Sequence, residues 1–93
     1  MKPYRVKHKP TGLYYQPAKG GNNLSECGKV YLTSNNPLSM DRGCDYIWID
    51  LKVNSRLYQK HKDSLPELEE CRYDGSKMRG REPKDKFEVE YLK

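Results

Sequence analysis

A stretch of strict alternation at residues 46–53 constrains the fold of this chain more than any other feature. The aliphatic side chains on one side of it are Ile47, Ile49, Leu51 and Val53. The opposite side is formed by Tyr46, Trp48, Asp50 and Lys52. Because successive side chains of a β-strand point to opposite faces of the sheet, this period of two predicts a strand with one face on the core. We expect it to be the central strand.

Shorter stretches of the chain show the same period. Residues 4–8 alternate, residues 10–12 contain the proline and glycine of a turn, and residues 13–15 are expected to complete an N-terminal hairpin. Residues 29–33 predict another short strand. Residues 87–91 alternate between large apolar side chains and glutamates, which predicts a C-terminal strand.

From Ser55 onward the apolar period lengthens to three or four residues, which predicts a helix with Ser55 as its N-cap. A capping-box pattern at 64–67 predicts a second short helix, so that the helical segment covers about 55–72. Residues 75–85 are polar and basic and are expected to form a loop. The predicted fold is α+β: one domain, 1–93, with a curved, mostly antiparallel sheet of about five strands and the helical segment on one face.

The composition of the chain bounds its function. With 93 residues, it has room for one small core. It has no apolar run long enough to cross a membrane and no secretion signal at its N-terminus. Its three cysteines are odd in number and include no Cys-x-x-Cys pair, which is typical of a cytoplasmic protein with reduced thiols. We expect no membrane association, metal or cofactor.

Catalysis is not expected either. His8 and His61 are the only histidines, and each falls on an apolar face, where imidazoles most often serve in packing. The cysteines have no local signature of a nucleophile. We therefore predict a binding protein with no catalytic residues.

The charge distribution favours an anionic partner. The net charge is +5, residues 1–25 contain no acidic side chain, and a second basic stretch covers 72–86. An acidic cluster of Glu67, Glu69 and Glu70 separates the two. The side chains predicted to bind nucleic acid are Lys77, Arg79 and Arg81 first, then Lys7 and Lys9, with Lys19, Lys29 and Trp48 as contributors. This hypothesis requires both basic stretches to meet on one open surface.

Two of these sites have an ordinary structural explanation. If the first and last strands are neighbours, Arg5 and Lys7 pair across the ladder with Glu88 and Glu90, and we favour this interpretation. An exposed Trp48 would be a platform on which bases stack. In so small a protein, however, we expect Trp48 to be buried.

A pattern in the first third of the chain resembles small accessory proteins of tailed bacteriophages. The matching segments are residues 4–15 (YRVKHKPTGLYY), 23–25 (NLS) and 28–31 (GKVY), and residues 54–58 (NSRLY) extend them. Most of that group has no assigned function, so the likeness assigns no site residues. It implies an early-expressed protein in the bacterial cytoplasm that binds and inhibits a host factor such as a toxin or defence nuclease.

Three hypotheses follow from the sequence. The leading one is a phage accessory protein that contacts RNA or single-stranded nucleic acid, in one version while restraining a host nuclease or toxin. A competing hypothesis is a protein-only inhibitor that docks through a sheet edge or through the Tyr14, Tyr15 and Trp48 surface. The third is a small structural or assembly component. The sequence leaves the oligomeric state and the choice between RNA and DNA open.

Overall fold

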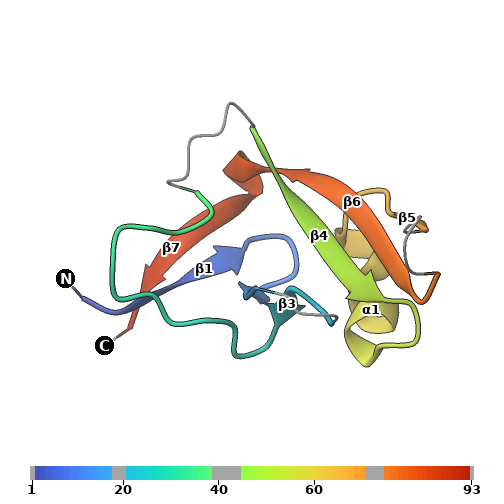
Figure 1. Cartoon of the computed structure of the whole chain (residues 1–93), viewed down its shortest axis with the longest axis horizontal. Coiled ribbons are helices and arrows are strands. Elements are labelled where there is room, and N and C mark those ends of the chain that lie inside the picture. The colour runs from blue at the N-terminus through green and yellow to red at the C-terminus, as the bar shows by residue number, and fades with distance from the viewer. Residues whose placement is uncertain (1, 18–20, 39–44, 71–74, 93) are drawn as a thin grey trace.

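The computed structural model describes residues 2–17, 21–38, 45–70 and 75–92. They form an α+β fold of two antiparallel sheets and a short helix, which confirms the predicted class (Figure 1). The β1 sheet has the strand order β3 (Leu24–Ser25), β2 (Tyr14–Tyr15), β1 (Tyr4–His8), β7 (Phe87–Tyr91). The β4 sheet has the order β4 (Tyr46–Lys52), β6 (Lys77–Pro83), β5 (Glu69–Glu70). The helical elements are α1 (Arg56–His61) and the 3-10 turns η1 (Lys62–Ser64) and η2 (Lys84–Lys86).

The β1 sheet joins the two ends of the chain. β1 pairs antiparallel with β2 and also with β7, with Val6 opposite Val89. The hairpin between β1 and β2 is confirmed, and its turn places Gly12 at φ 75°, which glycine adopts without strain. The strand predicted at 29–33 does not form. Tyr31 alone makes a bridge, and it exchanges backbone hydrogen bonds with Tyr4.

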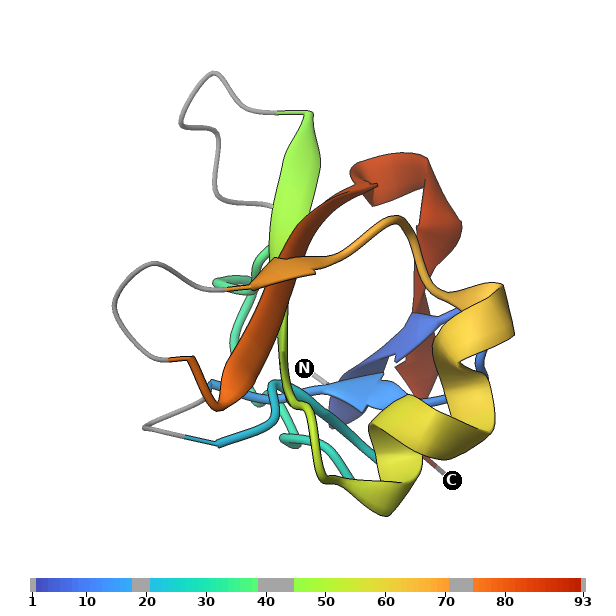
Figure 2. The same ribbon diagram turned by 90° about the vertical axis from the view of Figure 1, so that its right-hand side faces the viewer.

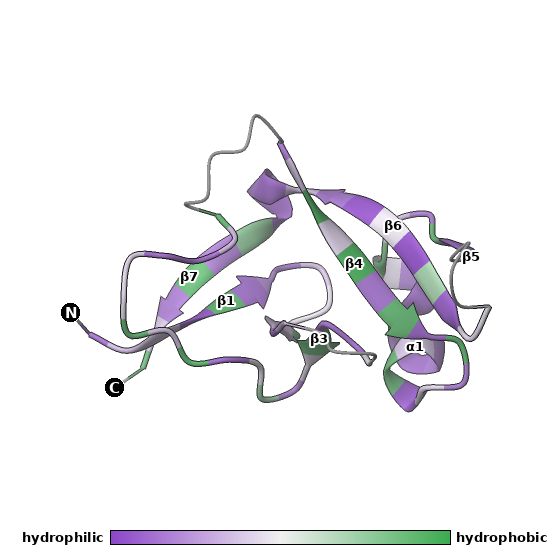
Figure 3. Cartoon of the chain, in the orientation of Figure 1, coloured by the Kyte–Doolittle hydropathy of each residue, from purple (hydrophilic) through white to green (hydrophobic). Residues whose placement is uncertain are grey.

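The alternation along β4 is confirmed, because Ile47, Ile49 and Leu51 are all buried. Figure 3 shows it as alternating bands of hydropathy along this strand. The position of the strand differs from the prediction. β6 is the central strand of this sheet, and β4 lies at its edge. β6 occupies the stretch that was predicted to be a loop. Its inward side chains are Met78, Gly80 and Glu82, of which only the first is a large apolar residue, so the usual signal of a buried strand face is absent.

The helix begins as predicted, since the Ser55 hydroxyl accepts a hydrogen bond from the Tyr58 N–H at 3.2 Å. The second helix predicted at 64–67 is wrong. After η1 the chain is extended and enters β5, whose residues pair with β6. Pairing with a neighbouring strand overrides the local capping-box preference at this point. None of the helical elements among the described residues has the length and apolar character to span a bilayer.

A buried pair of side chains joins the two sheets. Nε2 of His8 on β1 lies 2.6 Å from Oε2 of Glu82 on β6, and Nδ1 of His8 lies 2.7 Å from the Thr11 hydroxyl. Burial lowers the pKa of His8, and the hydrogen bond and charge of Glu82 oppose this shift. A neutral ring satisfies both contacts, because it donates from Nε2 and accepts at Nδ1. We call the His8–Glu82 contact the seam.

Asparagine side chains cover the outer edge of β4. The amide of Asn23 donates to the Trp48 carbonyl at 2.6 Å and accepts from the Asp50 N–H at 3.0 Å. Oδ1 of Asn22 accepts from the Lys52 N–H at 2.8 Å. These side chains satisfy backbone groups that an edge strand otherwise leaves unpaired. They also hold the backbone of Trp48 in place.

Candidate nucleic-acid interface

The register between β4 and β6 places aromatic side chains beside arginines. Trp48 is opposite Arg81, and Asp50 is opposite Arg79. Because the aliphatic residues of β4 point into the core, these side chains lie on the opposite, outer side of the sheet. We call the outward side chains Tyr46, Trp48, Asp50, Arg79 and Arg81 the arginine–aromatic face.

Both arginines of this face lie over aromatic rings. Cζ of Arg79 is 4.4 Å from the centre of the Trp48 ring. Cζ of Arg81 is 5.2 Å from the Trp48 ring and 5.0 Å from the Tyr46 ring. The two rings meet edge to face, with centres 5.5 Å apart. These cation–π and aromatic contacts hold several planar groups in a defined arrangement on the surface.

The two arginines differ in their charge partners. Nε of Arg79 lies 3.1 Å from Oδ1 of Asp50, although the pair is not aligned for a hydrogen bond. Arg81 is exposed, and among the described residues no carboxylate forms an ion pair with it. Arg81 is therefore the arginine of this face whose charge is available to a ligand.

Trp48 is 36% exposed, so the expectation that it is buried is wrong. Figure 2 gives the reason, because α1 and β1 lie on the same side of the β4 sheet and neither covers the opposite side. The helix packs on the aliphatic side, where Leu57 and Tyr58 contact the core. The indole is thus left on an open surface while its backbone is held by Asn23.

A shallow hollow of about 360 Å³ adjoins the tryptophan. It is lined by Trp48, Glu67, Glu69, Arg79, Gly80 and Arg81. The glutamates belong to the acidic cluster seen in the sequence, and β5 brings them to the arginines by pairing Glu69 with Arg79. The hollow therefore combines an indole ring, guanidinium groups and carboxylates.

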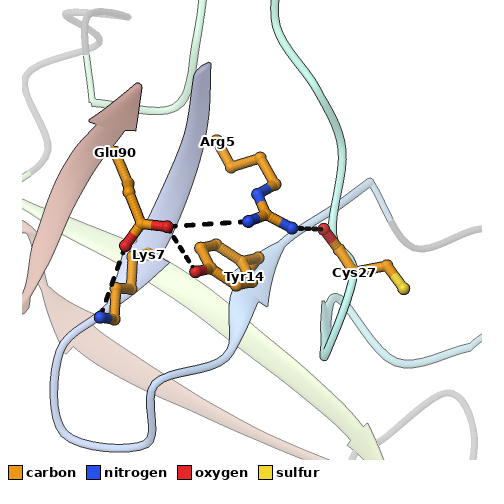
Figure 4. Close-up of polar contacts among 5 residues, drawn as sticks. All are labelled: Arg5, Lys7, Tyr14, Cys27 and Glu90. Carbon is orange, nitrogen blue, oxygen red and sulfur yellow. Dashed lines mark hydrogen bonds and ion pairs between the residues drawn. The ribbon is translucent and has the colours of Figure 1, made fainter. Parts of the chain in front are cut away.

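The basic residues of β1 are in a different environment (Figure 4). Arg5 and Lys7 form ion pairs with Glu90 of β7 at 3.7 and 3.5 Å. The Tyr14 hydroxyl donates to Glu90 at 2.6 Å, and Arg5 also lies over the Tyr14 ring and donates to the Cys27 carbonyl. The predicted cross-strand pairing is confirmed for Glu90, while Glu88 forms no ion pair with another described residue. We call this group the paired-charge face.

The same contacts shift two pKa values. The hydrogen bond from Tyr14 lowers the pKa of Glu90, and the charges of Lys7 and Arg5 act in the same direction. The hydrogen bond to Glu90 in turn raises the pKa of Tyr14. Both shifts keep Glu90 ionised and Tyr14 protonated, so the negative charge of Glu90 is engaged by its neighbours within the protein.

The other predicted binding residues are dispersed. Lys9 is exposed just beyond β1, and Lys29 is exposed with Nζ 5.1 Å from the centre of the Tyr31 ring. Lys77 is half-buried on β6, opposite Lys52. Lys19 lies outside the described residues, as do Cys44 and Cys71.

Among the basic residues that the structure describes, the expected common surface does not form. The two basic stretches belong to different sheets whose inner faces share one core, so their outward side chains point away from each other. The nucleic-acid hypothesis therefore fails in the form that joins both basic stretches, and among the described residues only the arginine–aromatic face remains as a candidate site. No family model, curated protein or solved structure matches this chain. The interpretation of the face therefore depends on its geometry and chemistry.

Proposed function

We propose that this protein binds single-stranded nucleic acid, RNA or DNA, through the arginine–aromatic face. The observation that carries the proposal is the Trp48 ring, 36% exposed, with Arg79 and Arg81 beside it on the outer side of the β4 sheet. Unpaired bases stack on aromatic rings and on guanidinium planes, and arginine also meets phosphates. A face with both groups at fixed positions serves both parts of a nucleotide.

The cations on β6 supply a path for the sugar–phosphate backbone. Arg81, Arg79 and Lys77 are alternate residues of one strand, so neighbouring members are separated by roughly 6.6 Å along it. Lys52 stands opposite Lys77 and widens the row at one end. Asp50 offsets part of the charge of Arg79, so we expect moderate affinity with a clear dependence on salt.

The resemblance to phage accessory proteins supplies a biological setting for this proposal. In that setting the bound strand is RNA in the bacterial cytoplasm, and a host nuclease or toxin that carries RNA is a natural target. The stacking proposal itself does not depend on this setting. It rests on the residues of the face.

Tryptophan fluorescence tests the proposal directly, because Trp48 is the only tryptophan in the chain. Titration with an unstructured RNA or DNA oligonucleotide is expected to quench the Trp48 emission as bases stack on the indole. Anisotropy of a labelled oligonucleotide gives the affinity independently. Binding without any change in Trp48 emission would place the ligand elsewhere and overturn the assignment.

Substitutions on the face separate stacking from charge. Trp48→Ala is expected to weaken binding by about 1–3 kcal/mol, and Trp48→Phe to retain part of it. Arg81→Ala should weaken binding and reduce the salt slope by about 0.7 for a lost phosphate contact. Arg56→Ala, which removes an exposed arginine from α1, is the charge-matched control and should leave affinity nearly unchanged. Equal losses in Arg81→Ala and Arg56→Ala would argue for net charge alone.

A second candidate function is protein binding at the edge of the β1 sheet. β7 ends the strand order, and its side chains Val89 and Tyr91 are 38% and 60% exposed. An extended segment of a partner protein adds to such an edge by backbone pairing. A protein-only inhibitor that docks through a sheet edge would use this strand.

Val89→Pro tests strand addition with little disturbance of the sheet. The bond from the Leu92 N–H to the Pro3 carbonyl sets the phase of the β1–β7 ladder, so the Val89 N–H points to the open edge. Proline removes that donor. Loss of a captured partner in Val89→Pro, but not in Trp48→Ala, would support this function over nucleic-acid binding.

A further inference from the structure

We infer that the hollow beside Trp48 selects guanine among the bases. This inference rests on the proposed function and assigns a base preference to the same face. Its starting point is that the lining carries groups of opposite charge within one small space: Arg79 and Arg81 on β6, and Glu67 and Glu69 on the neighbouring segment.

Within the part of the chain that the structure describes, the two carboxylates have no ion-pair partner and can accept hydrogen bonds from a ligand. Glu69 belongs to β5 and Glu67 lies two residues before it, and both side chains line the hollow. Both are exposed, and neither forms an ion pair with another described residue. Both line the same hollow as Trp48, so we expect them at the rim of a base that enters it.

The chemistry of the base edges decides the preference. Guanine presents two adjacent donors, N1–H and the 2-amino group, which the two oxygens of one carboxylate accept together. Adenine and cytosine place an acceptor beside their amino group, and uracil flanks its single N–H with carbonyl oxygens. A carboxylate repels those acceptors, so only guanine gains a bidentate contact.

The arginines argue against the other ligands that a carboxylate attracts. A lysine or arginine side chain of a peptide would meet the glutamates favourably but would be repelled by Arg79 and Arg81. A free phosphate would be attracted by the two arginines but repelled by the two glutamates. A guanine nucleotide carries a donor edge and an anionic phosphate in one molecule, and so matches both signs of charge.

Oligonucleotides that differ in one base test the inference. Octamers of uridine with guanine, inosine, adenine or cytosine at one central position are titrated against Trp48 fluorescence at fixed salt. Inosine is the sharpest comparison, because it keeps N1–H and lacks the 2-amino group. We expect the guanine octamer to bind about 10-fold more tightly than the inosine octamer, as for loss of one bidentate contact.

Amide variants locate the carboxylate responsible. Glu67→Gln and Glu69→Gln, singly and together, are expected to reduce the preference for guanine while leaving uridine octamer binding intact or stronger. Glu70→Gln is the matched control, since that side chain belongs to the same strand but does not line the hollow. Thermal unfolding of each variant confirms that it is folded.

The possible results distinguish guanine selection from the proposed binding of single-stranded nucleic acid. Quenching of Trp48 by all octamers with equal affinity would overturn guanine selection and leave the stacking face standing. Absence of quenching by any octamer would overturn both. A guanine preference that survives the double variant would show that the carboxylates do not read the base.

Discussion

On the β1 sheet and on the β4 sheet alike, an arginine of one strand lies over an aromatic ring of the next. Arg5 sits 3.9 Å from the centre of the Tyr14 ring, and Arg79 sits 4.4 Å from the centre of the Trp48 ring. The faces differ in their carboxylates. Glu90 is shared by Arg5, Lys7 and Tyr14, whereas Arg81 has no ion-pair partner among the described residues. The two surfaces differ because Glu90 pairs with both basic residues of β1, whereas Asp50 pairs with Arg79 of β6 and leaves Arg81 without an ion-pair partner among the described residues.

The largest expected effect is on the seam, because both faces depend on how the sheets pack. Glu82→Ala leaves the buried Nε2 of His8 without its partner, and we expect a loss of about 2–3 kcal/mol in the free energy of unfolding. Glu88→Ala, at an exposed position of β7, should change stability by less than about 0.5 kcal/mol. Urea denaturation measures both. Unchanged stability in Glu82→Ala would mean that the seam does not hold the sheets together.

Gly80→Ala is expected to damage the β4 sheet alone. A Cβ at this position would lie 2.5 Å from Cδ2 of Leu68 and 2.6 Å from the Glu67 carbonyl oxygen, so the segment leading into β5 must shift. We expect a loss of about 1–3 kcal/mol in stability, together with weaker oligonucleotide binding. Gly21→Ala is the control, since a Cβ there meets no atom within 4 Å. A Gly80→Ala protein with wild-type stability and binding would contradict the close packing of this segment.

Glu90→Gln is expected to make the paired-charge face more like the arginine–aromatic face in its binding of polyanions. Without the carboxylate charge, Arg5 and Lys7 become available to polyanions, and binding of an arbitrary oligonucleotide should tighten. The salt slope should steepen by up to about 0.7 for each phosphate newly met. Anisotropy titrations at several salt concentrations measure this effect in a Trp48→Ala background. A slope that does not change would show that the paired-charge face is unsuitable for polyanions for reasons other than Glu90.

The smallest expected effect is a pH dependence of stability from His8. Burial holds its folded-state pKa below the usual 6.5, so the unfolded chain binds more protons in the interval between the two values. Stability is therefore full above pH 6.5 and falls as the pH decreases below it, by at most about 1.4 kcal/mol per pH unit for one group. Of the charged or titratable neighbours, Glu82 opposes this lowering of the His8 pKa, and His61 and Lys86 add smaller contributions to it.

Urea denaturation between pH 7.5 and pH 5 follows this titration, in a range above the usual carboxyl pKa of 4.5. His61→Gln serves as the control, because it leaves the seam in place and removes only a minor contribution to the His8 shift, so it should retain most of the slope. Stability that rises as the pH falls would indicate that His8 is protonated in the folded protein.

Several elements followed from the sequence. The alternation of β4, the β1–β2 hairpin, the strand β7 and the Ser55 cap depend on local periodicity or on one hydrogen bond within a turn. The same reasoning missed β6, because its inward residues include a glycine and a glutamate. The capping-box pattern at 64–67 also predicted a helix, whereas the chain there leads into β5, which pairs with β6.

The candidate site was recognised only in parts. Trp48, Arg79 and Arg81 were each singled out from residue type and charge, yet their meeting on one face depends on a register between strands about 30 residues apart. Lys7 was selected for the same reason and is paired with Glu90. Charge density along the chain does not distinguish these cases, because the neutralising carboxylate comes from the far end of the sequence.

The sequence by itself determined which residues alternate, where the chain turns and that basic side chains outnumber acidic ones. Only the tertiary structure decided that the strands divide into two sheets, that Trp48 faces outward and that Arg81 rather than Lys7 lacks a carboxylate partner among the described residues. The physical reason is that periodicity arises from neighbouring residues along the chain. Burial and charge pairing depend instead on which distant strand lies alongside.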